Sequence, residues 1–171
     1  DGTLYAPEGG VSLTQRQYAR IMEVGEDNLD AVYHAVREYR SAYPDKAVTY
    51  NRRKSNGKEW VAYLAGASLC DIPTVDQPRF YTDGLQMSPL ETVTSAGRYW
   101  GMGKPSVGYV VYAVSDAVSI DLTDEKGTFI ARWINPVSGK QIGNAQKIAT
   151  GETHSLQTPD NKGVVLWMSK K

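Results

Sequence analysis

Three consecutive polar residues in the first half of the chain, Asn51, Arg52 and Arg53, are candidates for recognising a polar ligand. They stand at the end of a β-branched run, residues 46–51, which is typical of a short strand. An arginine guanidinium donates several hydrogen bonds in a fixed geometry, and this suits sugar hydroxyls or the carboxylate of an acidic sugar. The same residues also fit an ordinary solvated turn, because basic side chains are mostly exposed.

A second candidate surface for binding is aromatic. The chain has 11 Tyr and 4 Trp but only 2 Phe, so most of its aromatic rings carry a polar group. Tyr99 and Trp100 precede a glycine-rich stretch that we interpret as a turn, and exposed rings at this place would stack on a sugar. Tyr is also common in β-sheets, so the composition by itself does not identify a binding surface. Trp133 and Trp167 lie inside apolar strand-like runs and are predicted to be buried.

The sequence identifies no catalytic residue. Glu8 stands alone in a loop rich in Pro and Gly, and we expect it to be exposed. His34 and His154 have no metal-ligand neighbour at the usual spacing, and no serine lies in a Gly-x-Ser-x-Gly context, so no metal site and no serine nucleophile are predicted. Cys70 has no Cys partner and is expected to be a small buried hydrophobic residue. No cofactor is expected.

Charge and composition narrow the possible partners. The 171 residues include 19 basic and 19 acidic side chains, which gives a formal net charge of zero. A neutral chain has no general attraction to nucleic acid or to an anionic membrane surface. The apolar stretches are far shorter than the roughly 20 residues that cross a bilayer. The chain starts without methionine and without a visible signal peptide, so we expect that a leader or an upstream region precedes Asp1.

The spacing of apolar residues changes near position 90. Before it, spacings of three and four predict helices at 14–24, 27–43 and 58–69, with the strand at 46–51 between the last two. Residues 71–89 contain several Pro and Gly residues and are predicted to be irregular. After position 90, short alternating runs separated by turns predict an antiparallel β-sandwich. Its strands are expected at 98–100, 108–114, 118–122, 128–134, 147–149, 154–157 and 163–168.

The run TFIARWINPVSG at 128–139 resembles the strand and turn of a small β-sandwich that follows the (β/α)8 barrel in many bacterial polysaccharide-degrading enzymes. This sandwich is often labelled a collagen-binding domain of a collagenase. Residues 118–123, and Thr158-Pro159 ahead of 163–167, match the same pattern. The resemblance covers about half the chain. It implies that this is the carboxy-terminal region of a bacterial glycoside-hydrolase-like protein.

The resemblance also suggests a structural role for the first half of the chain. Residues 27–69 would be the last helix, strand and helix of the barrel, and 1–10 would be a loop at its active-site end. The fold class expected is α+β, with N-terminal helices and one barrel-type strand in residues 1–90 and an antiparallel β-sandwich in residues 91–171. Barrel enzymes build their sites at the carboxyl ends of the strands, which would place Asn51, Arg52 and Arg53 on a substrate rim.

Hydrolysis of a glycosidic bond needs two facing carboxylates. A barrel needs eight strands and only one is evident, so we expect the catalytic pair to lie upstream of Asp1, and we expect this chain alone to be inactive. The expected partners are a polysaccharide or oligosaccharide and an upstream barrel domain or partner chain. The expected location is secreted, periplasmic or at the cell surface.

Two alternatives remain open at this point. One is a stand-alone carbohydrate-binding module preceded by an N-terminal helical segment, and the other is a structural interaction domain without a ligand. Burial of the apolar helix 58–69 within the chain would make an autonomous module credible. A large exposed apolar face would favour a missing barrel.

Overall fold

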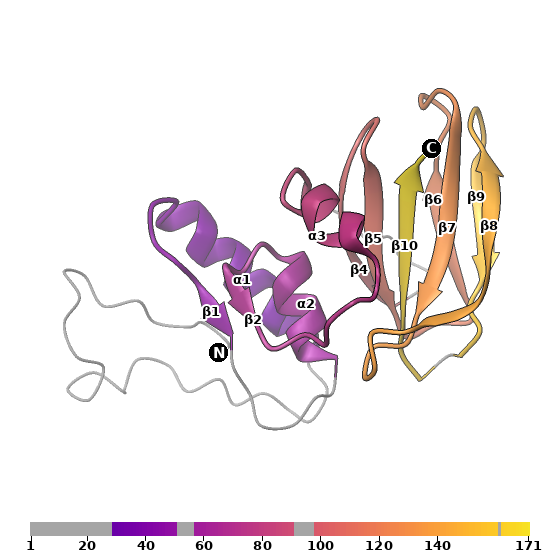
Figure 1. Ribbon diagram of the computed structural model, residues 1–171. Coiled ribbons are helices and arrows are strands. Elements are labelled where there is room, and N and C mark those ends of the chain that lie inside the picture. Colours follow the sequence, from indigo (N-terminus) through magenta and orange to yellow (C-terminus); the bar gives the residue numbers. More distant parts are fainter. Residues whose placement is uncertain (1–28, 51–56, 91–97, 161) are drawn as a thin grey trace, which may run out of the picture.

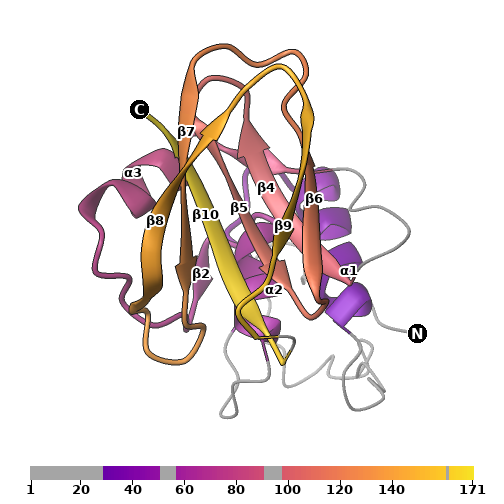
Figure 2. The same ribbon diagram turned by 90° about the vertical axis from the view of Figure 1, so that its right-hand side faces the viewer.

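The computed structural model of the protein describes residues 29–50, 57–90, 98–160 and 162–171 (Figure 1). These residues form three layers. A layer of helices with a two-stranded parallel sheet packs on one face of a six-stranded sheet, and a two-stranded antiparallel sheet packs on the other. In Figure 2 the two-stranded antiparallel sheet lies in front of the six-stranded sheet, with the helices behind. The predicted α+β fold with an antiparallel sandwich is confirmed.

The first described helix, α1 (Leu29–Ala42), lies within the predicted span 27–43. Its buried residues recur at spacings of three and four, which places them on the one face that meets the core. The next helix, α2 (Lys58–Leu64), ends earlier than the predicted span of 58–69. The cause is local, because Gly66 has φ of +92°, a left-handed conformation in which the helix cannot continue.

The residues after Gly66 form a strand that the sequence did not reveal. β1 (Thr49–Tyr50) and β2 (Leu69–Cys70) pair in parallel, with Thr49 opposite Leu69 and Tyr50 opposite Cys70. The segment β1–α2–β2 is therefore a βαβ unit, in which a helix carries the chain back to start a parallel neighbour. The expectation of a single strand in this half of the chain is wrong.

The stretch predicted to be irregular also contains regular structure. A helix, α3 (Pro78–Gly84), begins at Pro78, where a fixed φ and a missing N–H suit the first turn. A short strand, β3 (Ser88–Pro89), follows it at the edge of the large sheet. Pro89 is tolerated there because an edge strand has one side without ladder hydrogen bonds.

The six-stranded sheet is antiparallel and has the order β3-β4-β5-β10-β7-β8. Besides β3, its strands are β4 (Tyr99–Lys104), β5 (Gly108–Ala113), β7 (Thr128–Ile134), β8 (Gln141–Ala149) and β10 (Val164–Lys170). Of these, β4, β8 and β10 are longer than predicted. Gly101 and Gly103 lie inside β4, so the glycine-rich turn predicted there is wrong. Gly103 instead leaves room for the ring of Tyr109, its cross-strand partner, which would overlap any Cβ at that position.

β10 lies in the middle of this sheet and is buried on both faces. Val165 and Trp167 belong to the core on the helical side, whereas Val164, Leu166 and Met168 belong to the core on the other side. The second core is closed by β6 (Ala117–Asp121) and β9 (Thr153–Gln157), which pair with each other. A sheet covered on both faces explains why β10 is a nearly continuous apolar run.

The helical segment and the sandwich meet in a shared core. It combines residues of α1 and α2 with residues of β4, β5 and β10, so the predicted segments 1–90 and 91–171 are packed together. Trp60 of α2 is fully buried there and donates a hydrogen bond of 2.8 Å from its indole Nε1 to the carbonyl of Pro136, in the turn after β7. Within the described ranges no helix is long and apolar enough to cross a membrane.

Candidate functional site

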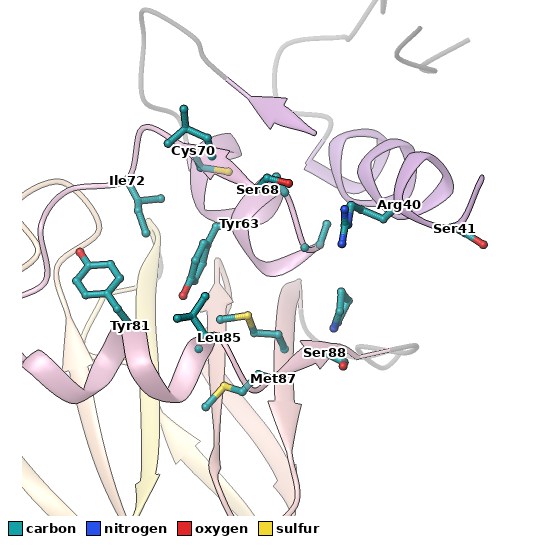
Figure 3. Close-up of a pocket in the computed structure, with 17 residues that line it drawn as sticks. Arg40, Ser41, Tyr63, Ser68, Cys70, Ile72, Tyr81, Leu85, Met87 and Ser88 are labelled. Carbon is teal, nitrogen blue, oxygen red and sulfur yellow. The ribbon is translucent and has the colours of Figure 1, made fainter. Parts of the chain in front are cut away.

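A pocket with a volume of about 720 Å³ lies beside β2, between the end of α2 and the helix α3 (Figure 3). The carboxyl end of α1 and the strand β3 complete its walls. In Figure 3 the side chains of Tyr63 and Leu85 lie at one part of the pocket, and Arg40 lies at the opposite part. The size is in the range of sites for small ligands or for a segment of another chain.

The polar groups of the pocket are few and neutral, with one exception. Arg40 is held by hydrogen bonds from its Nη1 to the carbonyl of Lys46 at 2.9 Å and to that of Pro44 at 3.5 Å. Both bonds are to the chain that leaves α1, so the guanidinium is fixed at the rim. Ser68 and Ser88 add hydroxyls, while the remaining lining is mostly aliphatic and aromatic.

Two tyrosines form the aromatic wall. The ring of Tyr63 stacks on Phe80 with centroids 6.1 Å apart, and burial raises the pKa of Tyr63 to about 12. The hydroxyl of Tyr81 accepts a hydrogen bond of 2.9 Å from the amide of Val75, which fixes the loop between β2 and α3. The Tyr63 phenol is therefore neutral at physiological pH, and both rings are held in place.

Cys70, the last residue of β2, also lines the pocket. Burial raises its pKa to about 12, and the nearby carboxylate of Glu59 adds to the increase. A thiol with such a pKa is almost entirely protonated near pH 7, so Cys70 is not an activated nucleophile. The sequence predicted a small buried hydrophobic residue at this position, whereas the side chain is half-buried.

The described residues that line the pocket include no carboxylate, whereas glycoside hydrolysis needs two. Across the part of the chain that the structure describes, no group of three or more His, Cys, Asp or Glu side chains could hold a metal ion. What the arrangement offers is an apolar surface with one fixed cation at its rim.

The aromatic residues predicted to bind sugar do not form one surface. Tyr99 is half-buried and its hydroxyl donates a hydrogen bond of 3.2 Å to the carbonyl of Ser119, on the sandwich side of the sheet. Trp100 is 4% exposed, its indole Nε1 donates a 2.7 Å hydrogen bond to Asp30, and its ring packs on the helical side. The exposure expected for Trp100 is wrong, because successive residues of β4 point to opposite faces and both faces are covered.

The other sequence candidates are distributed as follows. Asn51, Arg52 and Arg53 lie outside the described residues, as do Glu8 and the helix predicted at 14–24. The predicted burial of Trp133 and Trp167 is confirmed, each in a different core. The pocket residues Tyr63, Tyr81 and Leu85 were not predicted from the sequence. The one sequence feature that pointed to them was their apolar character, inside segments that we interpreted as helix or loop.

Three comparisons place the chain among known proteins. A family model described as "Domain of unknown function (DUF6298)" matches residues 1–87 of the 171. A glycoside hydrolase family 5 protein from Bacteroides vulgatus shares the fold, with a TM-score of 0.56 and 12% identity over 91% of this chain and 48% of that protein. A structure titled "Glycoside hydrolase" gives a TM-score of 0.56 and 11% identity over 90% of this chain and 50% of the other. No curated protein matches the sequence.

This chain therefore spans about half the length of these two structural neighbours. At such low identity the likeness concerns the fold alone. Neither neighbour carries the collagen-binding label, and that part of the sequence resemblance is not confirmed.

Proposed function

This chain belongs to the DUF6298 family, and from that membership together with its fold we propose that it is the carboxy-terminal part of a glycoside-hydrolase-like protein. In this proposal the protein serves polysaccharide degradation. The β-sandwich is non-catalytic and packs on a barrel formed by the remainder of the protein.

The observation that carries the proposal is the order of the elements. A parallel βαβ unit, β1–α2–β2, is followed directly by an antiparallel sandwich that shares a core with it. Parallel strands joined through helices are the repeating unit of a (β/α)8 barrel. Two such strands are described here, so the other strands of a barrel would come from further chain. The match to about half of each glycoside hydrolase neighbour agrees with this arrangement.

The chemistry of the pocket fits a supporting role. In this proposal the catalytic pair of the hydrolase lies upstream of Asp1, since hydrolysis needs two carboxylates and the described residues that line the pocket include none. Asn51, Arg52 and Arg53, which follow β1, are proposed to contact the substrate at the carboxyl end of the strands. Tyr99 is proposed as a separate sugar contact on the sandwich. The proposed location is secreted, periplasmic or at the cell surface.

The test compares two proteins on one panel of polysaccharides and oligosaccharides. The panel is incubated with this chain and, in parallel, with the complete polypeptide in which the sequence occurs, and reducing ends are measured. The proposal predicts hydrolysis by the complete polypeptide only. Robust hydrolysis by this chain alone would refute it, and so would inactivity of the complete polypeptide on every glycan of a broad panel.

A stand-alone carbohydrate-binding or structural module is the second candidate, and one observation favours it. Helix α2 is buried within the chain, with Trp60, Val61, Ala62 and Leu64 fully shielded from solvent. The chain thus covers its most apolar helix without further domains. A glycan array separates the two versions of this candidate, because binding that Tyr99→Ala abolishes would indicate a carbohydrate-binding module, whereas no binding would indicate a structural one.

A further inference from the structure

The parallel pair β1–β2 has one covered face and one open face. Val48, Tyr50 and Cys70 pack against the core on the helical side. Side chains alternate along a strand, so Thr49 and Leu69 point to the opposite face, where Leu69 is 69% exposed. Parallel sheets occur almost only with both faces covered. An exposed leucine on this pair therefore marks a face that is built to be covered.

Exposed apolar side chains gather at the same place. Four large apolar side chains are exposed in the described parts of the chain, and three of them, Leu69, Tyr81 and Leu85, line the pocket. Leu85 is 88% exposed. The fourth, Val137, lies in the turn after β7 and does not line the pocket. Single exposed apolar residues are ordinary, but a group around a concave surface is typical of an interaction site.

The edge of β2 runs along this pocket. Ser68, Leu69 and Cys70 contribute to its wall, and within the described ranges β1 is the one strand that pairs with β2. A strand edge carries N–H and C=O groups that can pair with a further strand. The pocket thus combines a strand edge with apolar side chains from α3 on the far side.

We propose that a β-strand from the remainder of a longer polypeptide adds in parallel to the open edge of β2 and buries Leu69 and Leu85. The inference rests on the proposed function, because it needs chain beyond this one. A strand with alternating apolar residues fits a lining that is neutral apart from Arg40. The parallel direction follows from the β1–β2 pair, since purely parallel sheets are over-represented. The structural neighbours, about twice as long, have the additional chain that such a strand requires.

The test uses one substitution in two proteins. Leu69→Lys is introduced into this chain and into the complete polypeptide in which the sequence occurs, and thermal unfolding is measured for both. Because Leu69 is largely exposed in the chain alone, we expect a change in Tm of at most about 1 °C there, and a decrease of about 5 °C or more in the complete polypeptide. Val137→Lys is the matched control, and we expect it to be nearly neutral in both.

Amide hydrogen exchange gives an independent readout. A strand paired to β2 would slow exchange of the Cys70 amide by about 100-fold in the complete polypeptide relative to this chain. The Leu69 amide faces β1, where it donates to the carbonyl of Val48, and serves as the internal reference. Equal exchange, together with a Leu69→Lys substitution that is neutral in both proteins, would overturn the inference. Glycan hydrolysis by the complete polypeptide is scored separately. If the complete polypeptide hydrolyses glycans but Leu69→Lys does not change its stability, only the proposal of the docked strand is refuted. If the complete polypeptide is inactive but Leu69→Lys destabilises it, only the proposed hydrolase function is refuted.

Discussion

Trp60 connects the helical layer to the sheet, and its removal should destabilise both together. The ring is fully buried, meets Phe80 edge-on with centroids 6.0 Å apart, and donates its indole N–H to Pro136 at 2.8 Å. Truncating a buried Trp to Ala costs about 3–5 kcal/mol, including the cavity. For a chain of this size that amounts to a decrease in Tm of about 8–16 °C.

A second substitution separates packing from hydrogen bonding. Trp60→Phe keeps an aromatic ring but removes the N–H donor to Pro136, so we expect a smaller loss of about 1–2 kcal/mol. The matched control is Val137→Ala, next to Pro136 but 75% exposed, for which a change within about 0.5 kcal/mol is expected.

The assay is equilibrium urea unfolding followed by two probes, far-ultraviolet circular dichroism for the helices and amide NMR peaks for β5 and β10. Because one core joins the layers, both probes should give the same midpoint in the wild type and shift by the same amount in Trp60→Ala. If the sheet peaks kept their original midpoint while the helices melted early, the inference of a shared core would be refuted.

Three further predictions concern a glycine, a thiol and alkaline pH. Gly57→Ala should lower the free energy of unfolding by about 2–4 kcal/mol, because a Cβ at this position would overlap the Tyr112 hydroxyl. Gly143 also has a left-handed backbone but is open to solvent, so Gly143→Ala should cost only about 1 kcal/mol. Equal losses for the two variants in urea unfolding would contradict the overlap. The pKa of Cys70, raised to about 12, should make iodoacetamide alkylation at pH 8 about 1000-fold slower than in the unfolded chain, and equal rates measured by mass spectrometry would exclude this. Tyr63, with its pKa raised from 10.0 to about 12, holds its proton more tightly when folded, so its contribution to stability is complete below pH 10 and is lost as the pH rises towards 12. Tyr63→Phe should therefore lose less stability than the wild type between those pH values, and parallel stability curves would count against the pKa shift.

The sequence predicted the elements whose apolar pattern is long and regular. Helix α1 and the strands β5, β6 and β7 lie close to their predicted positions because each has a sustained period of three to four or of two. β2 was missed because a two-residue strand has no period of its own and directly follows an apolar helix. α3 was missed because Pro78 and Gly84 were interpreted as breakers, although Pro is favoured in the first turn of a helix.

The candidate site was harder to predict for a physical reason. The alternation of side chains along β4 predicts that Tyr99 and Trp100 point to opposite faces of the sheet. It does not predict that helices cover the face to which Trp100 points, and these helices bury Trp100. Conversely, Leu69 and Leu85 have the composition of core residues, and their exposure depends on which chain lies over them. Burial by tertiary contacts from distant segments is not encoded in a local sequence pattern, so the sequence alone does not predict the pocket.

The central claim is that this chain is one part of a larger glycoside-hydrolase-like protein. Its most direct test is the intact mass of the native polypeptide that carries the sequence, measured after isolation under denaturing conditions. Since the chain accounts for 48–50% of its structural neighbours, we expect a mass of about twice 18.8 kDa or more. A polypeptide of 18.8 kDa that, in a parallel purification under native conditions, also carries no bound partner chain would contradict the claim.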